Sequence, residues 1–263
     1  MLKIDTISKT FFPGTVNERK ALQRVSLELD ESDFVTVIGS NGAGKSTLLN
    51  TISGRLPIDS GSITIDGAEV SRMPEYKRAK YLGRVFQDPM AGTAPDLTIE
   101  QNLSLALKRG KSRGLGRGTT SARRDLFADE LATLELGLEN RLKTKVGLLS
   151  GGQRQALSLL MAGFTQPRIL LLDEHTAALD PQRAALVTAL TKKIVANDGL
   201  TTLMVTHNME QAIALGNKLI MMHEGEIIYQ ASAKEKKNLT VEALLEEFSK
   251  LKGATLGDRA LLN

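Results

Sequence analysis

Residues 39–47 combine the residue types and the spacing that a phosphate-binding loop requires. They fit the pattern G-x-x-x-x-G-K-[ST] and comprise Gly39, Ser40, Asn41, Gly42, Ala43, Gly44, Lys45, Ser46 and Thr47. The glycines let successive backbone N–H groups approach an anion closely. We expect Lys45 to reach the β- and γ-phosphates of a nucleotide and the Ser46 hydroxyl to ligate Mg²⁺. The alternative is a glycine-rich turn with a chance lysine.

Two adjacent carboxylates follow a continuously apolar run. Residues 169–172 are Ile-Leu-Leu-Leu, and Asp173 and Glu174 come next. A buried strand that delivers a carboxylate beside a phosphate loop is the second part of an NTPase site, in which the aspartate holds Mg²⁺. Glu174 is then placed to orient and deprotonate an attacking water. The apolar run disfavours the alternative, which is surface charge at a strand end.

A second anion-binding pattern lies at residues 149–153, which read Leu-Ser-Gly-Gly-Gln. Ser150 is a typical helix N-cap, and Gly151 and Gly152 leave the N–H groups of the first helical turn accessible. A capped helix start without a ligand is the alternative. One nucleotide loop and two phosphate cradles in a single chain suggest that the cradles meet across a dimer.

The flanking sequence predicts the elements that position these motifs. The phosphate loop follows a short β-branched run at 34–38 and precedes a helix that ends at Gly54. Residues 98–164 have helical character. The remaining predicted elements are strands at 2–7, 25–29, 61–66, 84–87 and 201–205, a helix at 181–196, a hairpin at 218–229 and an amphipathic helix at 240–251, before a mobile tail, Gly253–Asn263.

Composition narrows the class of protein. The chain has 263 residues, 41% of them hydrophobic, which is enough for one large α/β domain or two small ones. It contains no cysteine, which excludes disulfides, thiol catalysis and cysteine-ligated zinc. We expect a soluble chain, because it shows neither a signal-peptide pattern nor an apolar run of about 20 residues. The net charge of +4 is too small to indicate nucleic-acid binding.

Much of the positive charge gathers in Lys108–Gly118, followed by Arg123 and Arg124. A solvated surface loop is the favoured interpretation. Contact with anionic lipid headgroups is the alternative.

These motifs together resemble the ATP-binding cassette (ABC) ATPases, the nucleotide-binding subunits of ABC transporters. Residues 39–47 match the Walker A motif, 169–174 the Walker B motif and 149–153 the family signature. Gln87 matches the glutamine loop, 178–180 the D-loop and His207 the switch histidine, all in family order. The resemblance covers residues 1–230, which leaves 231–263 as a C-terminal amphipathic helix and tail.

The resemblance implies a fold and a set of roles. It implies an α/β P-loop NTPase core with a mixed, mainly parallel sheet, an N-terminal antiparallel β part and an inserted helical subdomain at about 98–164. ATP and Mg²⁺ would be the cofactors, with Asp173 holding Mg²⁺ and Glu174 as base. Gln87 would contact Mg²⁺ or the attacking water, and His207 would contact the γ-phosphate. The partner subunit's ATP would be bound by Ser150, Gly151, Gly152 and Gln153. Asp180 would act across the dimer seam.

The sequence departs from the family pattern at two points. Phe11, with Phe12 as the alternative, stands where a tyrosine usually stacks on adenine, and ring stacking needs only an aromatic face. His175 stands where proline is common. We assign no catalytic role to His175 or His223.

The implied partners are a second copy of the chain across ATP, an integral membrane permease and an extracytoplasmic substrate-binding protein. The implied location is the cytoplasmic face of the membrane, and no nucleic acid is expected.

Two rival classes of protein remain. One is the soluble ABC ATPases of translation or DNA repair, which carry two cassettes, coiled coils or cysteines. The other is a regulatory cassette that binds ATP without hydrolysing it. Residues 84–103 and 173–180 resemble ATPases of bacterial uptake clusters labelled tryptophan/tyrosine transport. That likeness favours import of an amino acid or similar solute, with an exporter or lipoprotein-release system as the alternative.

Overall fold

The computed structural model describes residues 1–111, 114 and 118–252, with side chains through 249. The chain divides into two compact units, Met1–Arg78 together with the segment from Thr201, and Ala79–Leu200. No helix of the described residues is long and apolar enough to cross a membrane. The predicted tail at 253–263 lies outside the described residues, as do 112–113 and 115–117 of the basic stretch.

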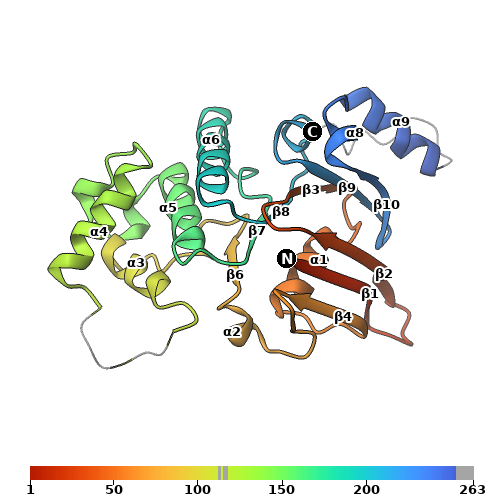
Figure 1. Cartoon of the computed structure of the whole chain (residues 1–263), viewed down its shortest axis with the longest axis horizontal. Coiled ribbons are helices and arrows are strands. Elements are labelled where there is room, and N and C mark those ends of the chain that lie inside the picture. Colours follow the sequence, from red (N-terminus) through yellow and green to blue (C-terminus); the bar gives the residue numbers. More distant parts are fainter. Residues whose placement is uncertain (112–113, 115–117, 253–263) are drawn as a thin grey trace. The chain divides into compact units, whose positions relative to one another are not determined.

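The first unit holds two sheets (Figure 1). One is antiparallel, in the order β2-β1-β4-β5, and in the other β9, β3 and β8 run parallel while β10 pairs antiparallel with β9. The strands are β1 (Leu2–Phe11), β2 (Arg19–Leu29), β3 (Phe34–Gly39), β4 (Ser60–Ile65), β5 (Ala68–Glu69), β8 (Thr202–Val205), β9 (Lys218–His223) and β10 (Glu226–Ala231). The helices are α1 (Lys45–Ser53), α2 (Glu75–Arg78), α7 (Met209–Ala214), α8 (Ala233–Lys236) and α9 (Val241–Lys252).

The amphipathic C-terminal helix α9 packs into the core of this unit. Its buried residues Leu244 and Phe248 join a cluster with Ile38 of β3 and Met221 of β9. Ile38 directly precedes the phosphate loop, so α9 supports the strand from which that loop emerges.

The second unit contains the helical segment and a parallel strand pair (Figure 1). Its elements are β6 (Leu82–Val85), α3 (Ile99–Leu107), α4 (Ser121–Ala132), two 3₁₀ turns (Glu139–Arg141 and Val146–Leu148), α5 (Gly151–Gly163), β7 (Ile169–Asp173) and α6 (Pro181–Asp198). β6 pairs parallel with β7, and α5 packs against both β6 and α6.

The predicted fold class is confirmed, and several boundaries differ. The strand predicted at 84–87 is β6, which ends at Val85, and the Phe86 carbonyl instead accepts a hydrogen bond from the Gln155 side chain. The predicted helical character of 98–164 is interrupted after α4 ends at Ala132, where Glu135 and Gly137 adopt positive φ angles of 58° and 67°. The helical subdomain predicted at 98–164 lies within the second unit, and its boundary stays a prediction.

The interpretation of the basic stretch as a solvated loop is wrong for Arg109. Its guanidinium donates to the carbonyls of Met161 and Ala162, both at 2.8 Å, at the C-terminal end of α5. Burial lowers the pKa of this arginine. Arg124, by contrast, pairs with Glu100 at 2.6 Å.

Arg78 is a buried cation that holds the C-terminal end of α1. Its guanidinium donates to the carbonyls of Thr51 and Ile52 in α1 and to those of Ser71 and Met73, at 2.7–3.0 Å. α1 begins at Lys45, so this contact anchors the helix that follows the phosphate loop.

We expect Arg78→Met to lower the free energy of unfolding by about 3 kcal/mol, because it leaves several buried carbonyls without a donor. Urea denaturation followed by circular dichroism measures the change. Arg72→Met, at an exposed arginine of the same segment, is the matched control and should stay within about 0.5 kcal/mol of the wild type. Equal losses in the two variants would contradict the anchoring role.

Candidate active site

The phosphate loop is held in a tight curve by the strands beside it. Gly39, Gly42 and Gly44 have φ angles of 148°, 79° and 100°. A Cβ atom added to Gly39 would lie 2.1 Å from the Met222 carbonyl oxygen, and one added to Gly44 would lie 2.4 Å from that of Ala21. Only glycine can therefore occupy these two positions.

Lys45 is buried within the loop that precedes it. Its ammonium donates to the carbonyls of Gly39 and Ser40, at 2.7 and 3.1 Å. The β9–β10 turn supports the same loop, because the Gly225 N–H donates to the Ala43 carbonyl at 3.0 Å. His223 lies 3.2 Å from the Ser40 hydroxyl through Nδ1, and its ring meets that of Phe248 edge-on. His223 is thus a supporting residue that the sequence analysis did not assign.

His207 leaves the sheet at the same edge as the phosphate loop. β3 and β8 are parallel neighbours with Val37 opposite Val205, where β8 ends, and β3 continues to Gly39. The Thr206 N–H donates to the Val37 carbonyl at 3.1 Å, which extends the pairing to the residue before His207.

Phe11 ends β1 directly opposite Arg19 of β2. Phe12, the alternative stacking residue, is 67% exposed and has a left-handed φ of 51°. The Arg19 guanidinium donates to the Gly42 carbonyl at 2.8 Å. Phe11 is therefore linked through its cross-strand partner to the phosphate loop, and it is the better-placed of the two rings.

In the second unit, β7 delivers Asp173 at its carboxyl end, as predicted. Asp173 pairs with Arg84 of β6 at 3.1 Å, and both side chains are mostly buried. The Arg84 guanidinium also lies 4.6 Å from the centre of the Phe86 ring. Glu174 follows at a positive φ of 43°, so the chain turns sharply at the predicted base. The sequence did not predict the pairing of Arg84 with Asp173, because it shows Arg84 only as a charged residue on a predicted strand.

The signature starts α5 with a complete capping box. The Ser150 hydroxyl accepts from the Gln153 N–H at 3.3 Å, while the Gln153 side chain accepts from the Ser150 N–H at 3.2 Å. The N-terminus of a 13-residue helix, with Gly151 and Gly152 in its first turn, follows this cap. Such a helix end favours anions through N–H groups that have no acceptor within the helix and through its dipole, although Gly152 itself is buried here.

Arg154 orders the segment that leads into the signature. Its guanidinium donates to the carbonyls of Val146, Gly147 and Leu149, at 3.0–3.2 Å. Val146 and Gly147 belong to the 3₁₀ turn Val146–Leu148. Their N–H groups donate to the carbonyls of Leu97 and Pro95, respectively. The loop that follows Gln87 is therefore connected to the signature segment through backbone hydrogen bonds.

Asp180 caps α6 in the structure. Its carboxylate accepts from the Arg183 N–H at 3.1 Å and pairs with the Arg183 side chain at 3.2 Å. Local capping accounts for this residue, and its predicted role across a dimer seam stays a prediction.

His175 is buried beside the predicted catalytic pair. Its Nε2 lies 2.9 Å from the Thr191 hydroxyl, which donates its single proton to the Val187 carbonyl. Nε2 must therefore carry the imidazole proton. Burial lowers the pKa of His175 to about 4. The neutral ring thus ties the residue after Glu174 to α6.

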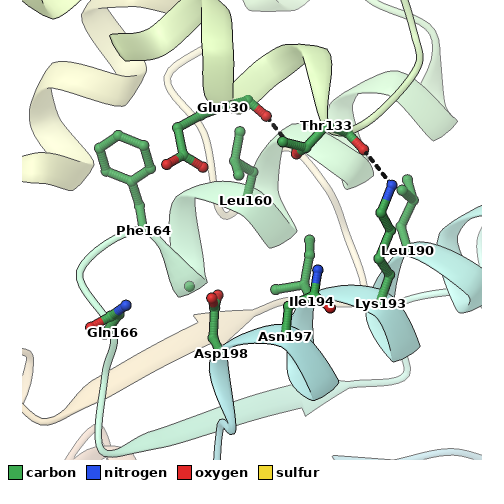
Figure 2. A pocket seen from close by; sticks show the side chains of 11 residues that line it. Glu130, Thr133, Leu160, Phe164, Gln166, Leu190, Lys193, Ile194, Asn197 and Asp198 are labelled. Carbon is green, nitrogen blue, oxygen red and sulfur yellow. Dashed lines mark hydrogen bonds between the residues drawn. The ribbon is translucent and has the colours of Figure 1, made fainter.

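A hollow of about 180 Å³ lies elsewhere in the second unit, between α4, α5 and α6 (Figure 2). Lys193 donates to the Thr133 carbonyl at its rim. Burial, together with the charges of Asp198 and Asp129, raises the pKa of Glu130. None of the predicted site residues lines this hollow, so it is not the candidate active site.

The predicted site residues divide between the two units. Phe11, the phosphate loop and His207 belong to the first, whereas Gln87, the signature, Asp173, Glu174 and Asp180 belong to the second. The fold and these motifs define a P-loop nucleotide-binding domain.

Comparison with known proteins places the chain within a family. The family profile described as "ABC transporter" matches residues 22–177. The chain is 47% identical over 249 residues to a "Tyrosine transport ATP-binding protein" of Clostridioides difficile, covering 94% of this chain and 98% of that protein. It belongs to the ABC transporter ATPase family, and it is an ATP-binding and ATP-hydrolysing subunit.

Solved structures agree with this assignment. One is the dimeric, post-hydrolysis cassette MJ0796 bound to ADP and Pi, with a TM-score of 0.75 and 31% identity over 89% of this chain and 99% of that one. Another is the ADP conformation of the cassette MJ1267, with a TM-score of 0.76 and 26% identity over 94% of this chain and 98% of that one.

The buried neutral state of His175 makes stability depend on pH. Between pH 6.5 and about 4 the unfolded chain binds a proton that the folded chain does not, so the free energy of unfolding falls as the pH falls. At pH 5 this loss amounts to about 2 kcal/mol. We expect His175→Gln to remove it, so that the variant loses less stability than the wild type between pH 7.5 and 5.

Denaturant titrations at several pH values measure this difference. His207→Gln, which removes an exposed histidine, is the control for histidine loss as such. Parallel stability curves for the wild type and His175→Gln would contradict the assignment.

Proposed function

We propose that the chain drives uptake of an aromatic amino acid of the tyrosine type through a separate membrane permease. The observation that carries this proposal is the 47% identity, over nearly the full length of both chains, to a protein named for tyrosine transport. A substrate-binding protein outside the membrane would deliver the solute, and the ATPase would act at the cytoplasmic face.

Within the site, we assign phosphate binding to Lys45, Ser46 and Thr47. Ser46, Asp173 and Gln87 offer oxygen atoms, the ligands that Mg²⁺ prefers, and Asp173 is fixed at the end of a buried strand. Mg²⁺, when bound there, would neutralise phosphate charge and orient the γ-phosphate. Glu174 would take the proton of the attacking water, and His207 would contact the γ-phosphate.

We further propose a head-to-tail homodimer in which the signature of one chain binds the ATP held by its partner. The capped N-terminus of α5, with two glycines in its first turn, supports this role because helix N-termini favour anions. The similar cassette MJ0796 was solved as a dimer with ADP and Pi. Asp180, one residue before α6, would face the seam.

The loop at 88–97 is the proposed docking site of the permease. Met90 is 40% exposed there, and the Arg154 guanidinium contacts its sulfur at 2.7 Å. Ala91 is also exposed, whereas Leu97 is only half-buried and its carbonyl pairs with Val146. A permease helix that buries Met90 would therefore press on a loop connected to the signature segment.

The substrate is tested by reconstituting the chain in proteoliposomes with the permease and binding protein encoded beside it. We expect tyrosine on the outside to raise the ATPase rate several-fold and to enter the vesicles, because bound solute is signalled through the permease. Glu174→Gln is the control and should bind ATP without turnover. Stimulation by an unrelated solute, or outward movement of solute, would overturn the proposal.

The docking site is tested by Met90→Glu, which places a charge where an apolar contact is expected. We expect the isolated chain to keep its basal ATPase rate within about twofold, while co-purification with the permease and solute-stimulated ATPase are lost. Leu126→Glu, at an exposed leucine of the second unit, is the matched control. Unchanged co-purification of Met90→Glu would move the docking site elsewhere.

A further inference from the structure

Arg19 occupies a position that the nucleotide-binding motifs do not include. It begins β2, directly opposite Phe11 of β1, so the two side chains leave the same face of the antiparallel pair. Its Nη2 atom donates to the Gly42 carbonyl at 2.8 Å. The Arg19 side chain thus starts from the strand position opposite Phe11 and ends at Gly42, in the middle of the phosphate loop.

The surroundings leave most of this cation available to a ligand. Arg19 is exposed, and no carboxylate of the described residues pairs with it. The nearest acidic neighbour in sequence, Glu18, accepts instead from the Gly14 N–H at 2.7 Å. A guanidinium carries five N–H donors in a rigid fork, and the contact with Gly42 uses one of its nitrogens.

The backbone also shows that Arg19 is packed closely against the loop. Gly42 has a φ of 79°, and a Cβ atom added there would lie 2.6 Å from Nη2 of Arg19. The loop therefore leaves room for the guanidinium at this glycine, and a side chain at position 42 would displace it.

We propose that Arg19 binds the phosphate chain of the nucleotide. A nucleotide whose base stacks on Phe11 would bring its phosphates to the loop, and the Arg19 guanidinium is held at Gly42 of that loop. Guanidinium groups bind phosphate oxygens through paired hydrogen bonds. This proposal rests on the proposed roles of Phe11 and the loop. It predicts a contact that ATP and ADP share, so Arg19 contributes to nucleotide affinity rather than to the hydrolysis step.

The test is equilibrium binding of ADP and of a non-hydrolysable ATP analogue to the purified full-length chain, measured by calorimetry over a range of salt concentrations. We expect Arg19→Gln to weaken both nucleotides about tenfold. We also expect it to flatten the dependence of affinity on salt, because a cation–phosphate contact is screened. Arg19→Lys should recover part of the affinity and the salt dependence. Arg24→Gln, at an exposed arginine of the same strand, should bind as the wild type does.

Two results would overturn the proposal. One is wild-type affinity in Arg19→Gln. The other is weaker binding with an unchanged salt dependence, which would reduce Arg19 to a support for the Gly42 carbonyl, a role that the glutamine amide can partly fill. Lys45→Ala separates this proposal from the assignment of the loop: if that variant binds ADP normally, the loop assignment itself fails, whatever Arg19 does.

Discussion

The absence of space for side chains in the phosphate loop is the constraint on which the active site depends. Gly39 lies against the backbone of β9 and Gly44 against that of β2, with built Cβ atoms 2.1 and 2.4 Å from carbonyl oxygens. The curve of the loop is therefore imposed by two neighbouring strands. Because these two strands pack against the loop, they also bring Arg19 of β2 and His223 of β9 into contact with it.

The two units hold their charged site residues in different ways. In the first, the cation Lys45 is held by carbonyls of its own loop, so the site presents a positive charge already oriented by the backbone. In the second, Asp173 is held by Arg84, and the element proposed to bind an anion is the N-terminus of α5, which carries no charged side chain in its cap. The first unit thus places the charge of Lys45 next to backbone N–H groups in one loop. In the second unit, the carboxylate of Asp173 and the N-terminus of α5 belong to different elements.

The elements next to each motif could be predicted because their signals are local. The run before Gly39, the glycine stop at Gly54 and the Ser150 cap each specify structure within a few residues. The sequence predicted the wrong boundary where a residue distant in the sequence determines where an element ends. β6 stops before Phe86 because Gln155 of α5 takes its carbonyl, and α4 stops at Ala132 while Leu134 and Leu138 remain buried through a turn.

The arginines show most clearly why the rest of the site was not predictable. Arg78, Arg109 and Arg154 each donate to carbonyls at the C-terminal end of a helix or 3₁₀ turn, where the backbone carries partial negative charge. A side chain this long reaches partners far away in sequence, so its neighbours along the chain do not reveal them. A cluster of basic residues therefore gives little evidence of an anionic partner until each guanidinium has been traced to the group that it contacts. Arg19 differs from the other three because the carbonyl that it contacts belongs to the loop proposed to receive the phosphates.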